Sequence, residues 1–64
     1  MKVTVYWVTK NPETKERIRI KLNLPRYTTI NGETEGIIND DDLPLLQKCE
    51  KRGFIQIRKK YGNN

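Results

Sequence analysis

With 64 residues, the chain is long enough for one domain with one thin hydrophobic core, whose margin of stability is small. It carries 13 Lys and Arg residues against 8 Asp and Glu residues, and the net charge of +5 suits either an anionic partner or solubility alone. The chain has no histidine, no serine and one cysteine, which excludes an internal disulfide and the usual pairing of a nucleophile with a base, so we predict that it is not an enzyme.

The first predicted element is a β-strand over residues 2–9, KVTVYWVT, which is rich in β-branched and aromatic residues. Alternation places Val3 and Trp7 on one face of this strand and Tyr6 and Val8 on the other. Because both faces are partly apolar, the pattern is typical of a central strand.

The same stretch bears on the location of the protein. Its apolar part runs only from residue 3 to residue 8, which is too short for the apolar region of a signal peptide or for a membrane span. The lone thiol of Cys49 suits a reducing compartment. We therefore predict a cytoplasmic protein that does not contact a membrane.

Residues 11–25, NPETKERIRIKLNLP, fit two structures. In their second half apolar and polar residues alternate, which is the period of a strand. Their ends, however, are those of a helix: Asn11 is a favoured cap, Pro12 suits the first helical position, and Asn23 suits the left-handed position after the last turn. We predict a helix, and we keep a strand over residues 16–24 as the alternative.

The next stretch, RYTTINGETEGII, predicts a β-hairpin. Asn31 and Gly32 both tolerate the positive φ of a two-residue type I′ turn, so residues 27–30 are expected to pair with residues 33–38. Gly36, inside the second arm, suggests a β-bulge.

A second helix and a last strand are predicted in NDDDLPLLQKCEKRGFIQIRKK. The polar run 39–42 offers a cap and places acids at the positive end of the helix dipole, Pro44 suits the first turn, and Gly53 suits the end. Residues 54–60 then read as a strand. Capping explains the three consecutive acids better than Ca²⁺ binding does, because calcium loops space their acids at alternate positions. We predict no metal site, no cofactor and no small-molecule substrate.

These elements predict an α+β fold over residues 1–60, with residues 61–64 as a frayed tail. Their order, βαββαβ, is that of the ferredoxin-like (split βαβ) arrangement, a four-stranded antiparallel sheet with two helices on one face. The alternative, with residues 16–24 as a strand, is a β-rich α+β domain with one helix. In the helix reading Ile20 points outward.

The open face of such a sheet is the predicted site. The favoured hypothesis is a non-enzymatic interaction or assembly module that self-associates, as a homodimer, or binds a protein partner. The candidate interaction face combines exposed aromatic and apolar residues: Tyr6, Trp7, Val8 and Tyr27. The alternative is a nucleic-acid-binding protein that stacks bases on the sheet. Its candidate basic rim consists of Arg26, Arg58, Lys59 and Lys60.

The segments VTVYW, YTTINGET and LPLLQKCEKRGFIQIRKK together cover most of the chain. In this layout the chain resembles small uncharacterised accessory proteins of tailed phages and prophages of gut bacteria. The resemblance implies an accessory role in particle assembly or in contact with a host component, either in the host cytoplasm or in the virion. It implies no catalytic or binding residues.

Overall fold

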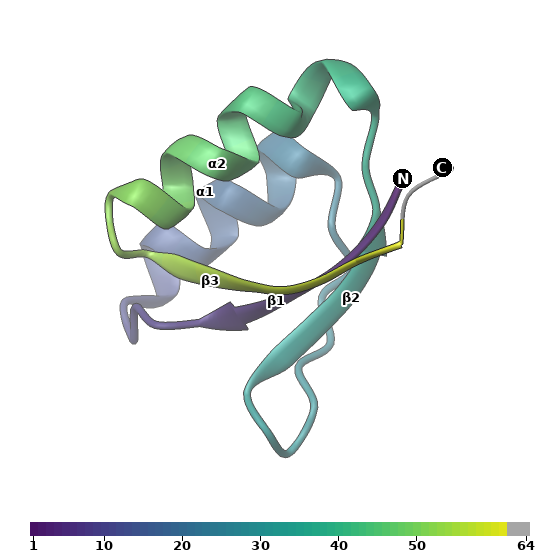
Figure 1. Cartoon of the computed structure of the whole chain (residues 1–64). Helices are drawn as coiled ribbons and strands as arrows, with labels where there is room; N and C mark the ends of the chain where they lie inside the picture. Colours follow the sequence, from purple (N-terminus) through teal and green to yellow (C-terminus); the bar gives the residue numbers. More distant parts are fainter. Residues whose placement is uncertain (62–64) are drawn as a thin grey trace.

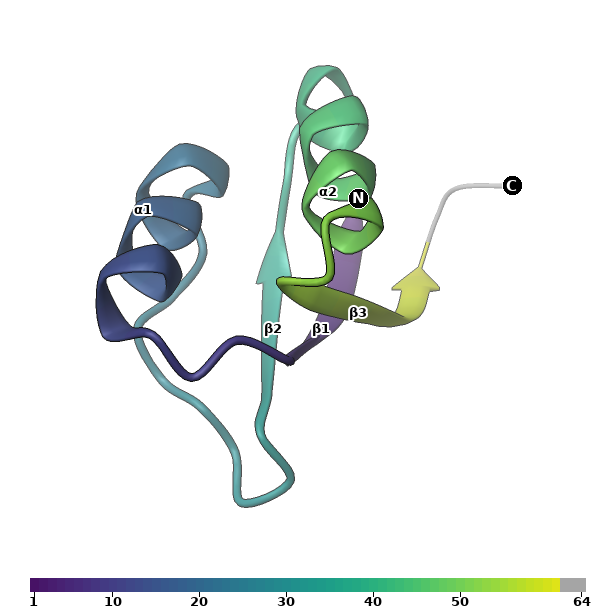
Figure 2. The ribbon, with the colours of Figure 1, turned by 90° about the vertical axis from the view of Figure 1, so that its left-hand side faces the viewer.

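The β-branched and aromatic residues near the amino end form the central strand of a three-stranded antiparallel sheet, as predicted (Figure 1). The computed structural model describes residues 1–61, and their fold is α+β. The elements in chain order are β1 (Lys2–Trp7), α1 (Pro12–Leu22), β2 (Glu33–Ile37), a 3₁₀ turn (Asp40–Asp42), α2 (Leu43–Lys51) and β3 (Ile55–Tyr61). The strand order is β2-β1-β3. Both helices lie on the same face of the sheet (Figure 2).

The core fills the space between this face and the two helices. The sheet contributes buried apolar side chains from β1 and β3, α1 contributes Ile18 and Leu22, and α2 contributes Leu46 and Cys49. Leu24 and Ile38, which follow α1 and β2 in the chain, are also buried. The core is therefore one layer deep, as the chain length predicts.

Helix α1 is confirmed, and the alternative strand over residues 16–24 is wrong. The Asn11 side chain accepts hydrogen bonds from the backbone N–H groups of Glu13 (2.9 Å) and Thr14 (3.2 Å). At the other end Asn23 adopts the left-handed conformation (φ 55°), and the Leu24 N–H donates to the carbonyl of Arg19 (2.9 Å). This is a Schellman motif, which satisfies carbonyls that the end of a helix leaves open.

The exposure of the side chains agrees with the helix. Ile20 is 69% exposed, whereas Ile18 and Leu22 are buried. The alternation of apolar residues was therefore a misleading signal, because one of the four apolar positions faces solvent. The capping residues at its two ends, Asn11 and Asn23, predicted the helix correctly.

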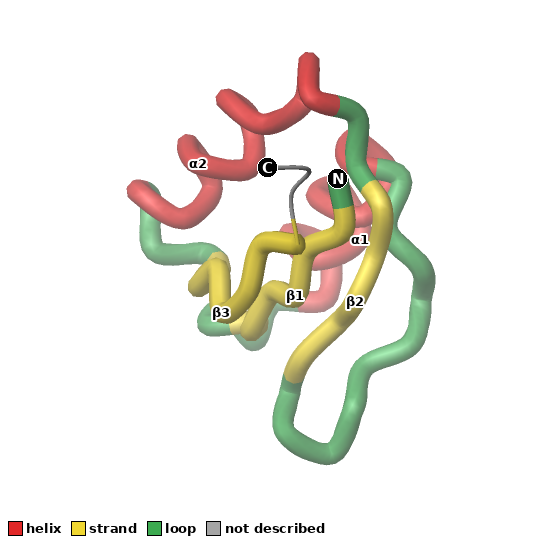
Figure 3. The backbone as a smooth tube through the Cα atoms, turned by 45° about the vertical axis from the view of Figure 1, so that its right-hand side comes forward, coloured by secondary structure: helices red, strands yellow, loops and turns green. Residues whose placement is uncertain are grey.

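The predicted fourth strand, Tyr27–Ile30, is a loop, so the four-stranded ferredoxin-like sheet is not confirmed. The loop runs beside β2 (Figure 3). Its path is set by Leu24 and Pro25, which pack against Gly36 so closely that a Cβ there would lie 2.6 Å from Cδ2 of Leu24. At Tyr27 the carbonyl accepts its hydrogen bond from the side-chain hydroxyl of Thr34 rather than from a backbone N–H.

The turn at the end of this loop also differs from the prediction. The Gly32 N–H donates to the carbonyl of Thr29 (2.9 Å), and the Thr29 N–H donates to the carbonyl of Glu33 (2.8 Å). Residues 30–32 therefore form a three-residue loop. Gly32 takes the left-handed position (φ 80°), whereas Asn31 does not, since Asn23 alone among the described non-glycine residues has a positive φ. The predicted type I′ turn is wrong.

The predicted bulge at Gly36 is also wrong, because β1 and β2 pair without interruption. A register shift occurs in the other pair, where Val5 lies opposite Ile57 and Thr4 lies opposite Lys59. Arg58 is thus the extra residue, which is a β-bulge in β3.

Helix α2 begins and ends near the predicted positions. Pro44 lies in its first turn, and after the helix Gly53 (φ 81°) takes the left-handed position while the Phe54 N–H donates to the carbonyl of Cys49 (3.1 Å). This is again a Schellman motif. The start differs from the prediction, because neither Asn39 nor Asp42 makes a side-chain capping hydrogen bond. Neither α1 nor α2 in the described chain is long and apolar enough to cross a membrane.

Strand β3 is an edge strand of the described sheet, and α2 covers part of its outer edge. The backbone N–H of Ile57 donates to Oε2 of Glu50 on α2 (2.9 Å). The strand continues to Tyr61, which pairs with Lys2, although this residue was predicted to open the tail. The rest of the predicted tail, residues 62–64, lies outside the described residues.

A chain of two hydrogen bonds, the first buried and the second partly buried, links β1, β2 and the loop. The indole Nε1 of Trp7 donates to Oγ1 of Thr34 (2.7 Å), and the same hydroxyl donates to the carbonyl of Tyr27 (2.8 Å). Trp7 and Thr34 are almost fully buried. On α1 the guanidinium of Arg19 lies over the indole ring, with Cζ 5.3 Å from the ring centroid.

Replacing Thr34 with Val should destabilise the fold. Val has nearly the shape of Thr but cannot accept from the Trp7 indole or donate to the Tyr27 carbonyl, and a buried unpaired polar group costs about 1–3 kcal/mol. We expect a loss of that order in the free energy of unfolding, measured by urea titration with Trp7 fluorescence. Thr34→Ser, which keeps the hydroxyl, should lose less, and equal losses for the two variants would contradict this account.

Replacing Gly36 with Ala should also destabilise the fold, because the new methyl group overlaps Leu24. Overpacking of this kind costs about 1–3 kcal/mol. In a Leu24→Ala background the obstructing Cδ2 is gone, so the same glycine substitution should cost less. Urea titration of the four proteins of this double-mutant cycle gives the coupling, and additive losses would show that Gly36 is not needed for the close approach.

Candidate functional site: a basic groove between the helices

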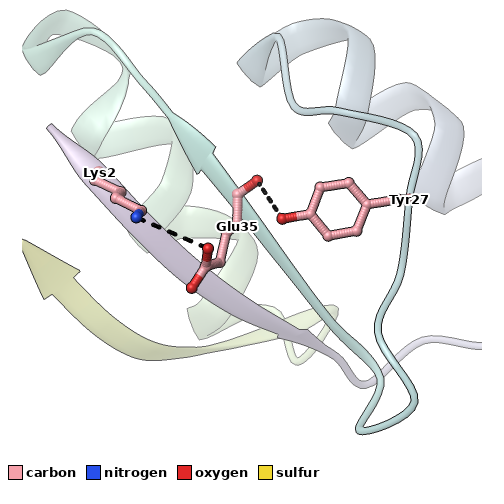
Figure 4. A network of polar contacts seen from close by, with 3 residues as sticks. All are labelled: Lys2, Tyr27 and Glu35. Carbon is pink, nitrogen blue, oxygen red and sulfur yellow. Dashed lines mark hydrogen bonds and ion pairs between the residues drawn. The ribbon is translucent and has the colours of Figure 1, made fainter.

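The four residues of the predicted interaction face do not come together. Trp7 is only 1% exposed and points into the core, opposite to Tyr6 on the other side of the sheet. Val8 lies just beyond β1, and Tyr27 lies in the loop beside β2. The hydroxyl of Tyr27 is 3.4 Å from the carbonyl of Glu35, whose carboxylate is 3.8 Å from Nζ of Lys2 (Figure 4).

The predicted basic rim is dispersed as well. Arg26, in the loop after α1, forms an ion pair with Glu16. Arg58 lies over the ring of Tyr6, with Cζ 4.7 Å from the centroid. Lys59 pairs with Thr4 and Lys60 with Val3, so these two neighbours point to opposite sides of the sheet.

Basic side chains do gather in a groove between α1 and α2. Its walls carry two pairs of cations, each pair spaced four residues apart and therefore on one side of its helix. They are Arg17 and Lys21 on α1, and Lys48 on α2 with Arg52 at the C-cap of α2. We call these four residues the groove cations. The groove has a volume of about 350 Å³.

The floor of the groove is mainly apolar. It is formed by Ile18 from α1, by Leu45 and Cys49 from α2, and by Phe54 after α2, and Thr14 adds one hydroxyl. Ile18 and Cys49 are core residues, whereas Leu45 and Phe54 are half-buried at its margin. A ligand in the groove would thus meet apolar surface below it and positive charge on both sides.

The groove cations are not neutralised by a direct ion pair among the described residues. Within residues 1–61 no acidic side chain lines the groove, and none of the four cations forms an ion pair within 4.0 Å. Like charges facing each other across a groove repel, so an anion placed between them is stabilised. The arrangement is suited to binding a negatively charged group.

The pKa of Cys49 reflects both the burial of its thiol and the positive charge of the groove. Burial raises the pKa of its thiol, and the positive charges of Lys21, Arg52 and Lys48 oppose this rise without cancelling it. The side chain is 8% exposed. A protonated, buried thiol is a poor nucleophile. Cys49 is therefore a packing residue at the floor of the groove.

The described residues contain no set of three His, Cys, Asp or Glu side chains close enough to hold a metal ion. Asp40–Asp42 form the 3₁₀ turn before α2. The sequence analysis did not predict the groove, because its four cations come from two helices that are far apart in the chain. The signal that identifies it is the four-residue spacing of basic residues next to a core position in both helices.

The raised pKa of Cys49 predicts a pH dependence of stability. The unfolded thiol loses its proton near its ordinary pKa of about 9, whereas the folded thiol keeps its proton to higher pH. The unfolded state then binds fewer protons, so stability should fall as the pH rises from that value through the folded pKa.

Urea titrations of the wild type and of Cys49→Ala between neutral and alkaline pH test this expectation. Other groups also titrate in this range, and the difference between the two proteins isolates the thiol. The wild type should lose more stability than the variant, and parallel pH profiles would contradict a raised pKa.

No protein-family model matches the chain, and no curated protein or solved structure matches it either. The resemblance to phage accessory proteins and the absence of enzymatic activity therefore stay predictions.

Proposed function

We propose that the protein is a non-enzymatic interaction module that holds an acidic segment of a protein partner in the groove between α1 and α2. The observation that carries this proposal is the convergence of the four groove cations, unpaired with any described acid, on an apolar floor. An accessory role of this kind is also what the resemblance to phage proteins implies.

The chemistry of the groove favours a segment that is both acidic and apolar. Contacts between exposed opposite charges contribute about 0.2–1 kcal/mol each, so four cations alone give weak binding. Burying one Leu-sized side chain against Ile18, Leu45 and Cys49 adds about 1.5–3 kcal/mol. Together these terms give about 2–7 kcal/mol, which corresponds to a Kd of about 10⁻⁵ to 10⁻² M that weakens with salt.

A protein segment fits the groove better than a nucleic acid does. Single-stranded nucleic acids bind by stacking their bases on exposed aromatic rings. In this chain Trp7 is buried, and the ring of Tyr6 already lies close to Arg58 and Lys10. The groove contains one aromatic residue, Phe54, and it is half-buried. Aliphatic side chains are the natural occupants of its floor.

Binding of a labelled peptide of alternating Glu and Leu residues tests the proposal. Fluorescence anisotropy should give a measurable Kd at about 0.05 M salt and a much weaker one at about 0.5 M. A Gln and Leu peptide of the same length should not bind. The bound peptide should also slow alkylation of Cys49, because the thiol lies at the floor of the groove.

A matched pair of variants locates the site. Lys48 and Lys51 both lie in the last turn of α2, but only Lys48 lines the groove. Lys48→Glu should weaken peptide binding by about fivefold or more, whereas Lys51→Glu should change it little. Equal effects of the two variants would indicate non-specific attraction. Tighter binding of random single-stranded DNA than of the acidic peptide would contradict the choice of partner.

A further inference from the structure

The sheet face turned away from the helices is divided by charge. Residues paired directly across antiparallel strands point to the same side. On this face Thr4 lies between Glu35 of β2 and Lys59 of β3, and Tyr6 lies between Glu33 and Gln56. The bulge residue Arg58 also lies on this face, over the ring of Tyr6.

The face therefore has an acidic column on β2, Glu33 and Glu35, and a basic column on β3, Arg58 and Lys59. The central strand β1 carries no acid, and on this face it presents Lys2, Thr4 and Tyr6. Nζ of Lys2 lies 3.8 Å from the carboxylate of Glu35, and both side chains remain about half exposed. Thr4 is only 5% exposed, so it does not hold an approaching surface away. At the end of β2 the face also presents Ile37, which is 73% exposed.

We propose that this face binds the same face of a second copy of the chain. The charge pattern selects the symmetry. A two-fold axis parallel to β1 places the acidic column of each copy over the basic column of the other. A two-fold axis perpendicular to the strands places acids over acids and bases over bases, which is repulsive.

The dimensions agree with the parallel axis. Sheets packed face to face lie about 10 Å apart, a gap that Glu35 of one copy and Lys59 of the other span together. The pairing is isologous, so each such contact occurs twice. Ile37 loses its exposure to water in the same contact. The helices of both copies face outward, and the basic grooves remain accessible.

The dimer is a weak one. Its contacts are mainly exposed ion pairs, which salt screens, and the face of a three-stranded sheet is small. We expect the dimer fraction to rise over protein concentrations of about 0.1–1 mM at low salt and to fall when salt is added.

Two charge-reversed variants test the proposal. In one, Glu33→Lys and Glu35→Lys make both columns basic; in the other, Arg58→Glu and Lys59→Glu make both columns acidic. Each variant alone should be monomeric by size exclusion with light scattering, and a mixture of the two should form a one-to-one heterodimer. Reversing two basic residues removes four units from the net charge of +5, so both variants stay net positive and their overall charge does not attract them.

The control is Lys48→Glu with Lys51→Glu, which changes the net charge equally on the helix side. This variant should dimerise like the wild type but should no longer bind the acidic peptide. The experiment can therefore contradict one proposal without contradicting the other. Circular dichroism and urea titration check that all variants fold. A wild type that is monomeric at about 1 mM, reversed variants that still dimerise, or a mixture that stays monomeric would each overturn the proposal.

Discussion

The hydroxyl of Thr34 holds the fold together at the point where three segments meet. It accepts from the Trp7 indole and donates to the Tyr27 carbonyl, so one side chain joins the central strand, its neighbour and the loop beside them. Without it, the largest core residue would bury an unpaired N–H. The indole in turn supports α1, whose Arg19 lies over the ring, and α1 forms one wall of the groove. The position of the basic surface thus depends on a hydrogen bond made in the core.

The two faces of the molecule use charge differently. On the helix side, four like charges surround an apolar floor, which favours a ligand of opposite sign. On the sheet side, the acids of β2 and the bases of β3 lie in separate columns with β1 between them, which favours a surface with the same pattern reversed. The net charge of +5 conceals this division, because a total says nothing about where the charges lie.

What the sequence predicts well is local. The caps of α1 depend on residues within a few positions of each other, so Asn11, Pro12 and Asn23 were sufficient to identify the helix. The prediction of a fourth strand was wrong because the path of this segment depends on the contact of Leu24 with Gly36. These residues are far apart in the sequence, and no local pattern encodes their contact. The prediction of the site was incomplete for the same reason, because the basic faces of α1 and α2 form a groove only after both helices pack on the sheet. Trp7 was placed on the surface because alternation gives two faces without saying which is inside.

The hydrogen bond between the Ile57 amide and the Glu50 carboxylate protects the edge of the sheet formed by β3. An incoming β-strand, from a fibril or a misfolded neighbour, needs the amide of Ile57 as a donor, and that amide is already bound. The lysines further along β3 and the β-bulge at Arg58 make the same edge still less suitable as a template. Lateral growth into extended aggregates is therefore obstructed by a side chain from the helix layer. A small domain with a thin core has this protection at the place where it would otherwise polymerise.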